Sequence, residues 1–231
     1  MVPWLVSPNA FPDTTLALKE PNGLLCAGGD LEPATIVAAY SRGIFPWFSD
    51  DQPVLWWSPD PRMVLFPAEF KISKSLSKTV QSQKFDVRFD SAFAEVIAGC
   101  AAPREPEGGT WIVPAMQEAY LRMHQLGVAH SVESWSGGKL IGGLYGIALG
   151  RMFFGESMFT RATDASKVAL VALVEKLRRD GFELIDCQQQ TRHLASFGAR
   201  PISRGDFVQR LKELINLGQS GSHWRVEHVK A

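Results

Sequence analysis

The sequence is poor in the patterns that identify metal sites, disulfide frameworks and nucleotide-binding loops. Its three cysteines, Cys26, Cys100 and Cys187, lie far apart and form no CxxC pair, which argues against a zinc ribbon and favours reduced thiols. Motifs of the HExxH, GxSxG and P-loop types are also missing, so the usual metalloprotease, serine hydrolase and nucleotide hydrolase classes are not predicted. We expect neither a metal nor another cofactor.

Long apolar runs and an excess of charge are missing as well. The longest apolar run, 168–174, has 7 residues, whereas a membrane helix needs about 20. Residues 1–10 have no basic segment and are interrupted by Pro3 and Pro8, unlike a signal peptide. Lys and Arg number 24, as do Asp and Glu, so binding of nucleic acid would require a local basic face. We expect a cytoplasmic protein with no membrane partner.

Prolines and tryptophans are concentrated at the start of the chain. Residues 1–61 hold Trp4, Trp47, Trp56 and Trp57 and most of the 14 prolines. Such sequence is typical of an irregular α/β unit with short strands, here with one helix at about 33–42. We therefore predict a small N-terminal domain over 1–61.

Regular α+β sequence follows, over the predicted larger domain 62–231. Periodicity and turn residues predict strands at 63–66, 85–89, 129–135, 140–149, 151–159 and 182–187. Helices are predicted at 73–83, at 90–99 after Asp90 as the cap, at 114–127, at 165–179 after Asp164 as the cap, and at 206–217. This order is that of an acetyltransferase-like (GNAT-like) domain with a central, mostly antiparallel sheet, although many α+β domains share it.

Two carboxylates in apolar strands are candidate functional groups. Alternation places Asp186 and Gln188 on one face at the end of a buried strand, which is unfavourable unless both are paired. The alternative is a turn, with Asp186 capping the next segment. Glu156 lies in the apolar segment 152–159 and needs a cation, either from an internal Arg or Lys or from a ligand.

Tryptophans and lysines offer two further candidates, each with a structural alternative. Trp47 and Trp111 follow glycine-containing segments and could be core residues or could stack on an unpaired base. Five basic residues could be a solvated face or could contact phosphates. They are Lys71, Lys74 and Lys78, which share one helical face, together with Lys84 and Arg88.

Seven segments closely resemble the leucyl/phenylalanyl-tRNA–protein transferase family, in order and over nearly the whole chain. They are 20–31, 40–48, 55–62, 109–112, 154–159, 185–188 and 193–199. The resemblance implies an aminoacyltransferase that moves Leu, Phe and also Met from aminoacyl-tRNA to an N-terminal Arg or Lys of acceptor proteins. It further implies that this reaction marks the acceptors for degradation under the N-end rule, and we expect the enzyme to be a monomer.

The same resemblance implies roles for individual residues. Asp186 and Gln188 would form the reaction centre and would orient and help deprotonate the attacking amine. Our own hypothesis is that Asp186 polarises the Gln188 amide, which holds the acceptor amine. Trp47 and Trp111 would enclose the terminal adenine of tRNA, and Glu156 would lie beside the acyl and acceptor groups. The other residues implied for substrate binding are Tyr40, Tyr120, Leu144, Phe153, Gly155, Ser157, Met158, Leu170, Leu173, Leu177 and Ile185. Family members would be expected to carry larger aromatics at 173 and 177, which bears on donor preference.

Two other functions fit parts of the pattern. A CoA-dependent N-acetyltransferase would need a glycine-containing turn for the pyrophosphate, but the segment 160–167 has no glycine and includes Asp164, which would repel phosphate. A non-catalytic tRNA-binding protein would explain the tryptophans and lysines but not Glu156, Asp186 and Gln188. Since an aminoacyl ester is already activated, transfer requires positioning and stabilisation of an oxyanion rather than ATP or a metal.

Overall fold

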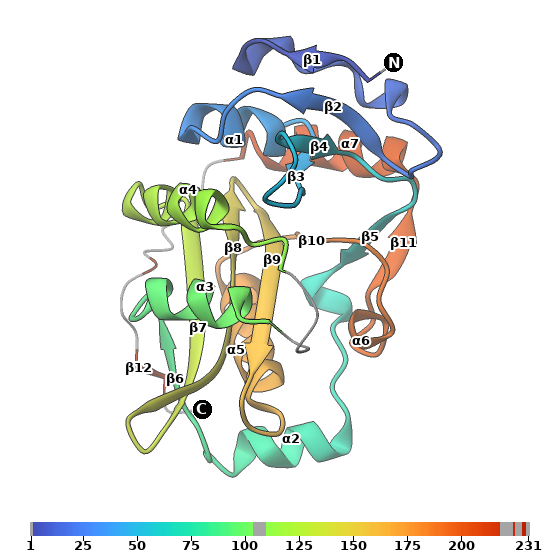
Figure 1. The fold of residues 1–231 in the computed structure, drawn as a ribbon. Coiled ribbons are helices and arrows are strands. Elements are labelled where there is room, and N and C mark those ends of the chain that lie inside the picture. The colour runs from blue at the N-terminus through green and yellow to red at the C-terminus, as the bar shows by residue number, and fades with distance from the viewer. Residues whose placement is uncertain (1, 104–109, 218–223, 225–227, 230–231) are drawn as a thin grey trace.

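The computed structural model describes residues 2–103, 110–217, 224 and 228–229, which form a mixed α+β fold with two sheets (Figure 1). The smaller sheet has the order β1-β2-β4-β3. Its strands are short and alternate with proline-containing turns, because proline cannot donate a hydrogen bond within a sheet. Its elements are β1 (Trp4–Leu5), β2 (Leu24–Gly28), α1 (Pro33–Tyr40), β3 (Phe45–Pro46) and β4 (Leu55–Trp57).

The larger sheet has eight strands in the order β11-β5-β10-β9-β8-β7-β6-β12. Neighbouring strands are antiparallel, except that β9 and β10 are parallel. Helix α5 connects this parallel pair, as such a pair requires a crossover. The strands are β5 (Arg62–Leu65), β6 (Asp86–Phe89), β7 (Ala129–Ser136), β8 (Lys139–Leu149), β9 (Met152–Thr160), β10 (Leu184–Gln188), β11 (Arg200–Ile202) and β12 (His228–Val229).

Helices cover both faces of the larger sheet (Figure 1). Along β8, Leu144 and Ala148 pack in the core beneath α5, whereas Tyr145 and Ile147 pack in the core shared with α3 and α4. Among the described helices, none combines the length and the hydropathy that a bilayer crossing requires. The helices are α2 (Lys74–Gln81), α3 (Phe93–Ala101), α4 (Pro114–Gln125), α5 (Ala165–Arg179), α6 (Arg192–Ala195) and α7 (Arg204–Leu214).

The two sheets share one hydrophobic core. Tyr40 from the first part of the chain, Tyr145 from the larger sheet and Phe207 from α7 belong to the same buried cluster. Helix α7 therefore joins the C-terminal part of the chain to the N-terminal sheet. The change of sheet falls between β4 and β5, near the predicted boundary, but because the core is continuous the division into 1–61 and 62–231 stays a prediction.

Most of the predicted helices and strands are present, with ends shifted by a few residues. Of the two predicted caps, Asp164 stands at the cap position of its helix and Asp90 does not. Helix α3 begins at Phe93 rather than directly after Asp90. Asp90 has a φ of 52°, and its carboxylate accepts the N–H of Ser131 at 2.8 Å. Asp164 precedes α5 but makes no capping hydrogen bond, since its carboxylate pairs with Lys167 at 2.7 Å. The Asp90 carboxylate thus has a partner far away in the sequence, and the Asp164 carboxylate has one three residues further along the chain.

Candidate active site

A cavity opens where the parallel pair β9–β10 ends. The two strands pair at only three positions, from Leu184 opposite Met152 to Asp186 opposite Phe154. Just beyond, β9 has an extra residue, Glu156, relative to β8, and β10 has an extra residue, Cys187, relative to β5. Such bulges interrupt pairing and redirect side chains. The cavity between the separating strands has a volume of about 560 Å³.

The cavity wall brings together most of the predicted substrate-binding residues. Its apolar part includes Leu144, Phe153, Met158, Leu170, Leu173 and Ile185, and its polar part includes Gly155, Glu156, Ser157, Asp186 and Gln188. Leu177 does not belong to this wall: it is fully buried in the core beneath α5, so the prediction that it binds the donor side chain is wrong. Tyr40 and Tyr120 are also fully buried and reach the site only through their hydroxyl groups.

Trp47 and Trp111 both lie on the cavity wall. Trp47 is 38% exposed and is therefore not a core residue. Its ring meets the Trp57 ring edge-on, with centroids 5.5 Å apart, and the indole N–H of Trp57 donates to the Trp47 carbonyl at 2.7 Å. Trp111 is half-buried and packs against the main core. Both rings are available on the side of the cavity.

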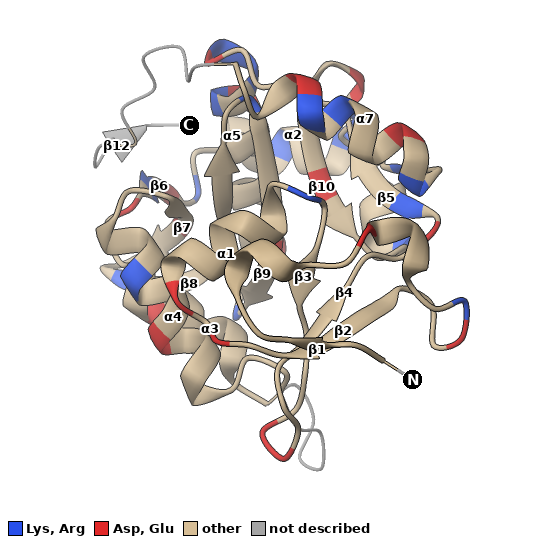
Figure 2. Cartoon of the chain, turned by 90° about the horizontal axis from the view of Figure 1, so that it is seen from above, with Lys and Arg blue, Asp and Glu red and all other residues tan. Residues whose placement is uncertain are grey.

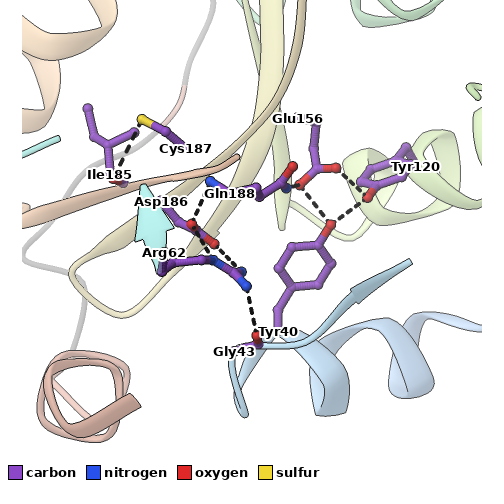
Figure 3. A network of polar contacts seen from close by, with 9 residues as sticks. All are labelled: Tyr40, Gly43, Arg62, Tyr120, Glu156, Ile185, Asp186, Cys187 and Gln188. Carbon is purple, nitrogen blue, oxygen red and sulfur yellow. Dashed lines mark hydrogen bonds and ion pairs between the residues drawn. The ribbon is translucent and has the colours of Figure 1, made fainter. Parts of the chain in front are cut away.

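Asp186 forms a buried ion pair with Arg62 (Figure 3). The guanidinium donates through Nε and Nη2 to the two carboxylate oxygens, at 2.8 and 2.7 Å, and through Nη1 to the Gly43 carbonyl at 3.1 Å. The Arg62 and Asp186 side chains are 1% and 0% exposed. This geometry links β5, β10 and the loop after α1, because Arg62 of β5 donates both to Asp186 of β10 and to the Gly43 carbonyl.

The expected relay from Asp186 to the side-chain amide of Gln188 is not present. The Asp186 carboxylate instead accepts the backbone N–H of Gln188 at 2.9 Å, as a residue that caps a turn does. The Gln188 side-chain amide donates to Glu156 at 3.0 Å. The bulge at Cys187 and a φ of 58° at Gln188 separate the two side chains, which simple alternation had placed together.

Glu156 is held by two tyrosines rather than by a cation (Figure 3). The Tyr40 and Tyr120 hydroxyls donate to its two oxygens at 2.7 and 2.8 Å, and they lie 2.6 Å from each other. In the described part of the chain no Lys or Arg pairs with this carboxylate, so the alternative of an internal cation is wrong. Burial raises the pKa of Glu156 to about 7, although the tyrosine hydrogen bonds lower it.

The predicted phosphate contacts are not part of the cavity wall. Lys71, Lys74, Lys78 and Lys84 are exposed, and α2 lies at the end of the molecule opposite the four-stranded sheet (Figure 1). Arg88 differs, because it pairs with Asp86 at 2.7 Å. Seen from the four-stranded sheet, basic and acidic residues alternate around the rim (Figure 2).

Sequence reasoning missed Arg62 and the polar residues that follow β10. Arg62 begins a buried apolar strand, and that position was a usable signal, since a buried guanidinium needs a carboxylate partner. Gln189, Thr191 and His193 also line the cavity, where the chain leaves β10 and enters the short helix α6. Within the described ranges, no group of three His, Cys, Asp or Glu side chains could hold a metal ion.

Comparison with known proteins identifies the family. The model of the leucyl/phenylalanyl-tRNA protein transferase family matches residues 64–212, and the model of its N-terminal domain matches residues 29–60. The chain belongs to this family. A leucyl/phenylalanyl-tRNA–protein transferase from Aromatoleum aromaticum is 60% identical, over 98% of this chain and 96% of that protein. One from Nitrosospira multiformis is 57% identical, over 99% of this chain and 98% of that protein.

The leucyl/phenylalanyl-tRNA protein transferase family consists of aminoacyltransferases, so the chain is an enzyme of this class. Among solved structures, L-PGS from Bacillus licheniformis aligns over 71% of this chain and 55% of that chain. Its sequence is 12% identical and the TM-score is 0.39, which is too low to support a functional argument.

Proposed function

We propose that this transferase moves leucine, phenylalanine or methionine from aminoacyl-tRNA to proteins that begin with arginine or lysine. The observation that carries the proposal is the composition of one cavity. It joins two tryptophans, an apolar wall and the polar residues Glu156, Ser157, Asp186 and Gln188, which we call the polar row. A donor of this class needs all three parts, because it ends in an unpaired adenine, an apolar side chain and a reactive ester.

The donor end fits the outer and apolar parts of the cavity. Trp47 and Trp111 enclose the terminal adenine, and each base–aromatic contact contributes about 1–3 kcal/mol. The amino-acid side chain enters between Leu170 and Leu173 of α5 and Ile185 of β10. A wall made of aliphatic groups accepts leucine, phenylalanine and the flexible methionine side chain, and it disfavours charged side chains, which would lose their hydration there.

The acceptor end fits the polar row. Because the Gln188 amide nitrogen is directed at Glu156, its carbonyl oxygen is left to accept an N–H from the acceptor amine. The Glu156 carboxylate supplies negative charge toward a cationic acceptor. Gln188 therefore orients the attacking amine, and Asp186 acts on it indirectly, by fixing the backbone N–H of Gln188 at 2.9 Å.

Positioning supplies the chemistry, since the ester is already activated. Holding an amine and an ester in reactive orientation replaces an encounter between free molecules, which can lower a barrier by about 7–11 kcal/mol in well-oriented cases. No cofactor is required for this step. Lys71, Lys74, Lys78 and Lys84, which are exposed, contact phosphates of the tRNA body, away from its end, with Arg88 partly neutralised by Asp86.

Several wider features belong to the same proposal. The enzyme is a cytoplasmic monomer that marks its acceptors for degradation. Residues 1–61 form an N-terminal domain that contributes Trp47, and residues 62–231 form a GNAT-like catalytic domain. The parallel pair β9–β10, which separates after three paired positions, supports the GNAT-like assignment, because an acyl group can then enter between the strands.

The test is transfer of labelled leucine from charged tRNA to matched peptides. A peptide that begins with arginine should be labelled at its amino terminus. The same peptide with an acetylated amino terminus, or with glutamate in first place, should not. Tight tRNA binding without labelling would instead support the non-catalytic alternative. That alternative does not explain why the polar row is present.

A further inference from the structure

The contacts around Glu156 raise a question of proton count. Three oxygen-bearing groups, from Glu156, Tyr40 and Tyr120, contact one another at 2.7, 2.8 and 2.6 Å. All three distances are in the hydrogen-bond range for oxygen pairs. They come from β9, α1 and α4, three elements that meet behind the polar row (Figure 3).

Two hydroxyl hydrogens cannot serve three contacts. When Glu156 is ionised, each tyrosine donates to one carboxylate oxygen, and the contact between the hydroxyls has no hydrogen. When Glu156 carries a proton, three hydrogens fill three contacts in one circular direction. The same positions of the heavy atoms therefore suit both protonation states, so a proton can enter or leave without rearrangement.

The surroundings of Glu156 contain no free cation among the described residues. The titratable groups that face it are the hydroxyls of Tyr40, Tyr120 and Tyr145 and the carboxylate of Asp186, which is paired with Arg62. Gln188 adds a neutral donor at 3.0 Å. Burial and Asp186 raise the pKa of Glu156 to about 7, whereas the pKa of each tyrosine is far above neutrality. Among Glu156 and the three tyrosines, Glu156 is therefore the group that changes charge near neutral pH.

The reaction needs a proton acceptor, and Glu156 is the group in contact with Gln188 that can take up a proton near neutral pH. The acceptor amine has a pKa of about 7.7–8.0 and is mostly an ammonium ion at neutral pH, which cannot attack an ester. Gln188 is an amide and takes up no proton, and the Asp186 oxygens are engaged by Arg62 and by the Gln188 N–H. Glu156 lines the cavity and is partly accessible from it.

We propose that Glu156 is the proton acceptor of the transfer reaction, with Tyr40 and Tyr120 as its positioning residues. This assignment rests on the proposed function. The acceptor ammonium gives one proton to Glu156, and the free amine forms a C–N bond with the ester carbon. The C–O bond to tRNA breaks, a second proton from the nitrogen goes to the leaving 3′ or 2′ oxygen, and Glu156 releases its proton to water.

The experiment measures kcat/KM for transfer to an arginine-initiated peptide between pH 5.5 and 8.5, at saturating leucyl-tRNA. In the unmodified enzyme the acidic limb should have a midpoint near 7, set by Glu156. In Glu156→Gln the limb should follow the acceptor amine, with its midpoint at about 7.7–8.0. At pH 7 the loss should be about three- to sixfold, because about a tenth to a sixth of the amine is then unprotonated, whereas about half of Glu156 is ionised in the unmodified enzyme.

A second acceptor separates proton transfer from structure. This acceptor is a peptide that carries an aminooxy group in place of its N-terminal amine. Because the aminooxy group is unprotonated at neutral pH, it should restore the pH 7 rate of Glu156→Gln to near that of the unmodified enzyme. Tyr40→Phe and Tyr120→Phe should each move the acidic limb upward by about one unit, because the ionised carboxylate loses a hydrogen bond. Affinity for leucyl-tRNA should stay unchanged in all three variants.

Two results would overturn the proposal. One is a Glu156→Gln enzyme that keeps its acidic limb near pH 7 and shows only a raised KM. That result is expected if Glu156 only binds the acceptor side chain. The other is no recovery with the aminooxy peptide. Failure of the unmodified enzyme to label any arginine-initiated peptide would refute the proposed function instead, so the two failures are distinguishable.

Discussion

Replacing Asp186 with asparagine should mainly destabilise the fold, with the loss of activity following from that. The change keeps the shape of the side chain but removes its charge, and it places an amide nitrogen opposite one of the guanidinium donors of Arg62. The guanidinium is 1% exposed and lies between the Phe45 and Phe207 rings, with its carbon 4.8 and 4.6 Å from their centroids. Water therefore cannot take the place of the lost carboxylate.

The expected magnitude follows from burial. Removing one partner of a buried ion pair reduces the free energy of unfolding by about 3–5 kcal/mol. For a chain of this size the midpoint of thermal unfolding should fall by about 6–20 °C. The matched control is Asp86→Asn, which breaks the pair with Arg88, where the side chains are 28% and 41% exposed. That change should reduce the free energy of unfolding by about 1 kcal/mol or less.

Thermal unfolding and leucine transfer, measured on the same preparations, test this reasoning. Asp186→Asn should lose stability and transfer together, whereas Arg62→Met combined with Asp186→Leu should recover stability without transfer, because the Gln188 N–H still lacks its acceptor. An Asp186→Asn enzyme that melts within about 2 °C of the original, a shift worth about 1 kcal/mol or less, and loses only its rate would refute the structural role. It would restore the idea that Asp186 polarises Gln188.

Three other predictions concern substrate binding. Trp111→Ala and Trp47→Ala should each weaken aminoacyl-tRNA binding by about 1–3 kcal/mol with the fold retained by circular dichroism, and normal affinity would exclude stacking. Charge reversal at Lys74 and Lys78 should weaken binding of whole tRNA and reduce its salt dependence, but equal damage to transfer from an aminoacylated adenosine would contradict phosphate contact. Leu173→Phe should narrow the cavity and favour leucyl- over phenylalanyl-tRNA by about tenfold or more in competition, and an unchanged ratio would remove this residue from the donor site.

The sequence alone determined most of the local structure. The three strands at 129–160 follow from apolar alternation interrupted by glycine turns, and the buried helix at 165–179 follows from apolar residues on most faces. Gly150 shows why such signals are reliable, because its φ of 55° at a tight turn is one that glycine adopts without steric cost. These features depend on neighbours within a few residues, so local pattern is enough.

The partners inside the site were decided only by the tertiary structure. Arg62 and Asp186 are 124 residues apart, and Tyr40 is 116 residues from Glu156. Alternation predicted one face for Asp186 and Gln188, but the bulge at Cys187 added a residue to β10 and directed the two side chains to different partners. A bulge forms where neighbouring strands fit together imperfectly, and no window of single-strand sequence contains that information. For this reason the residues of the site were readable from the sequence, and their hydrogen bonds were not.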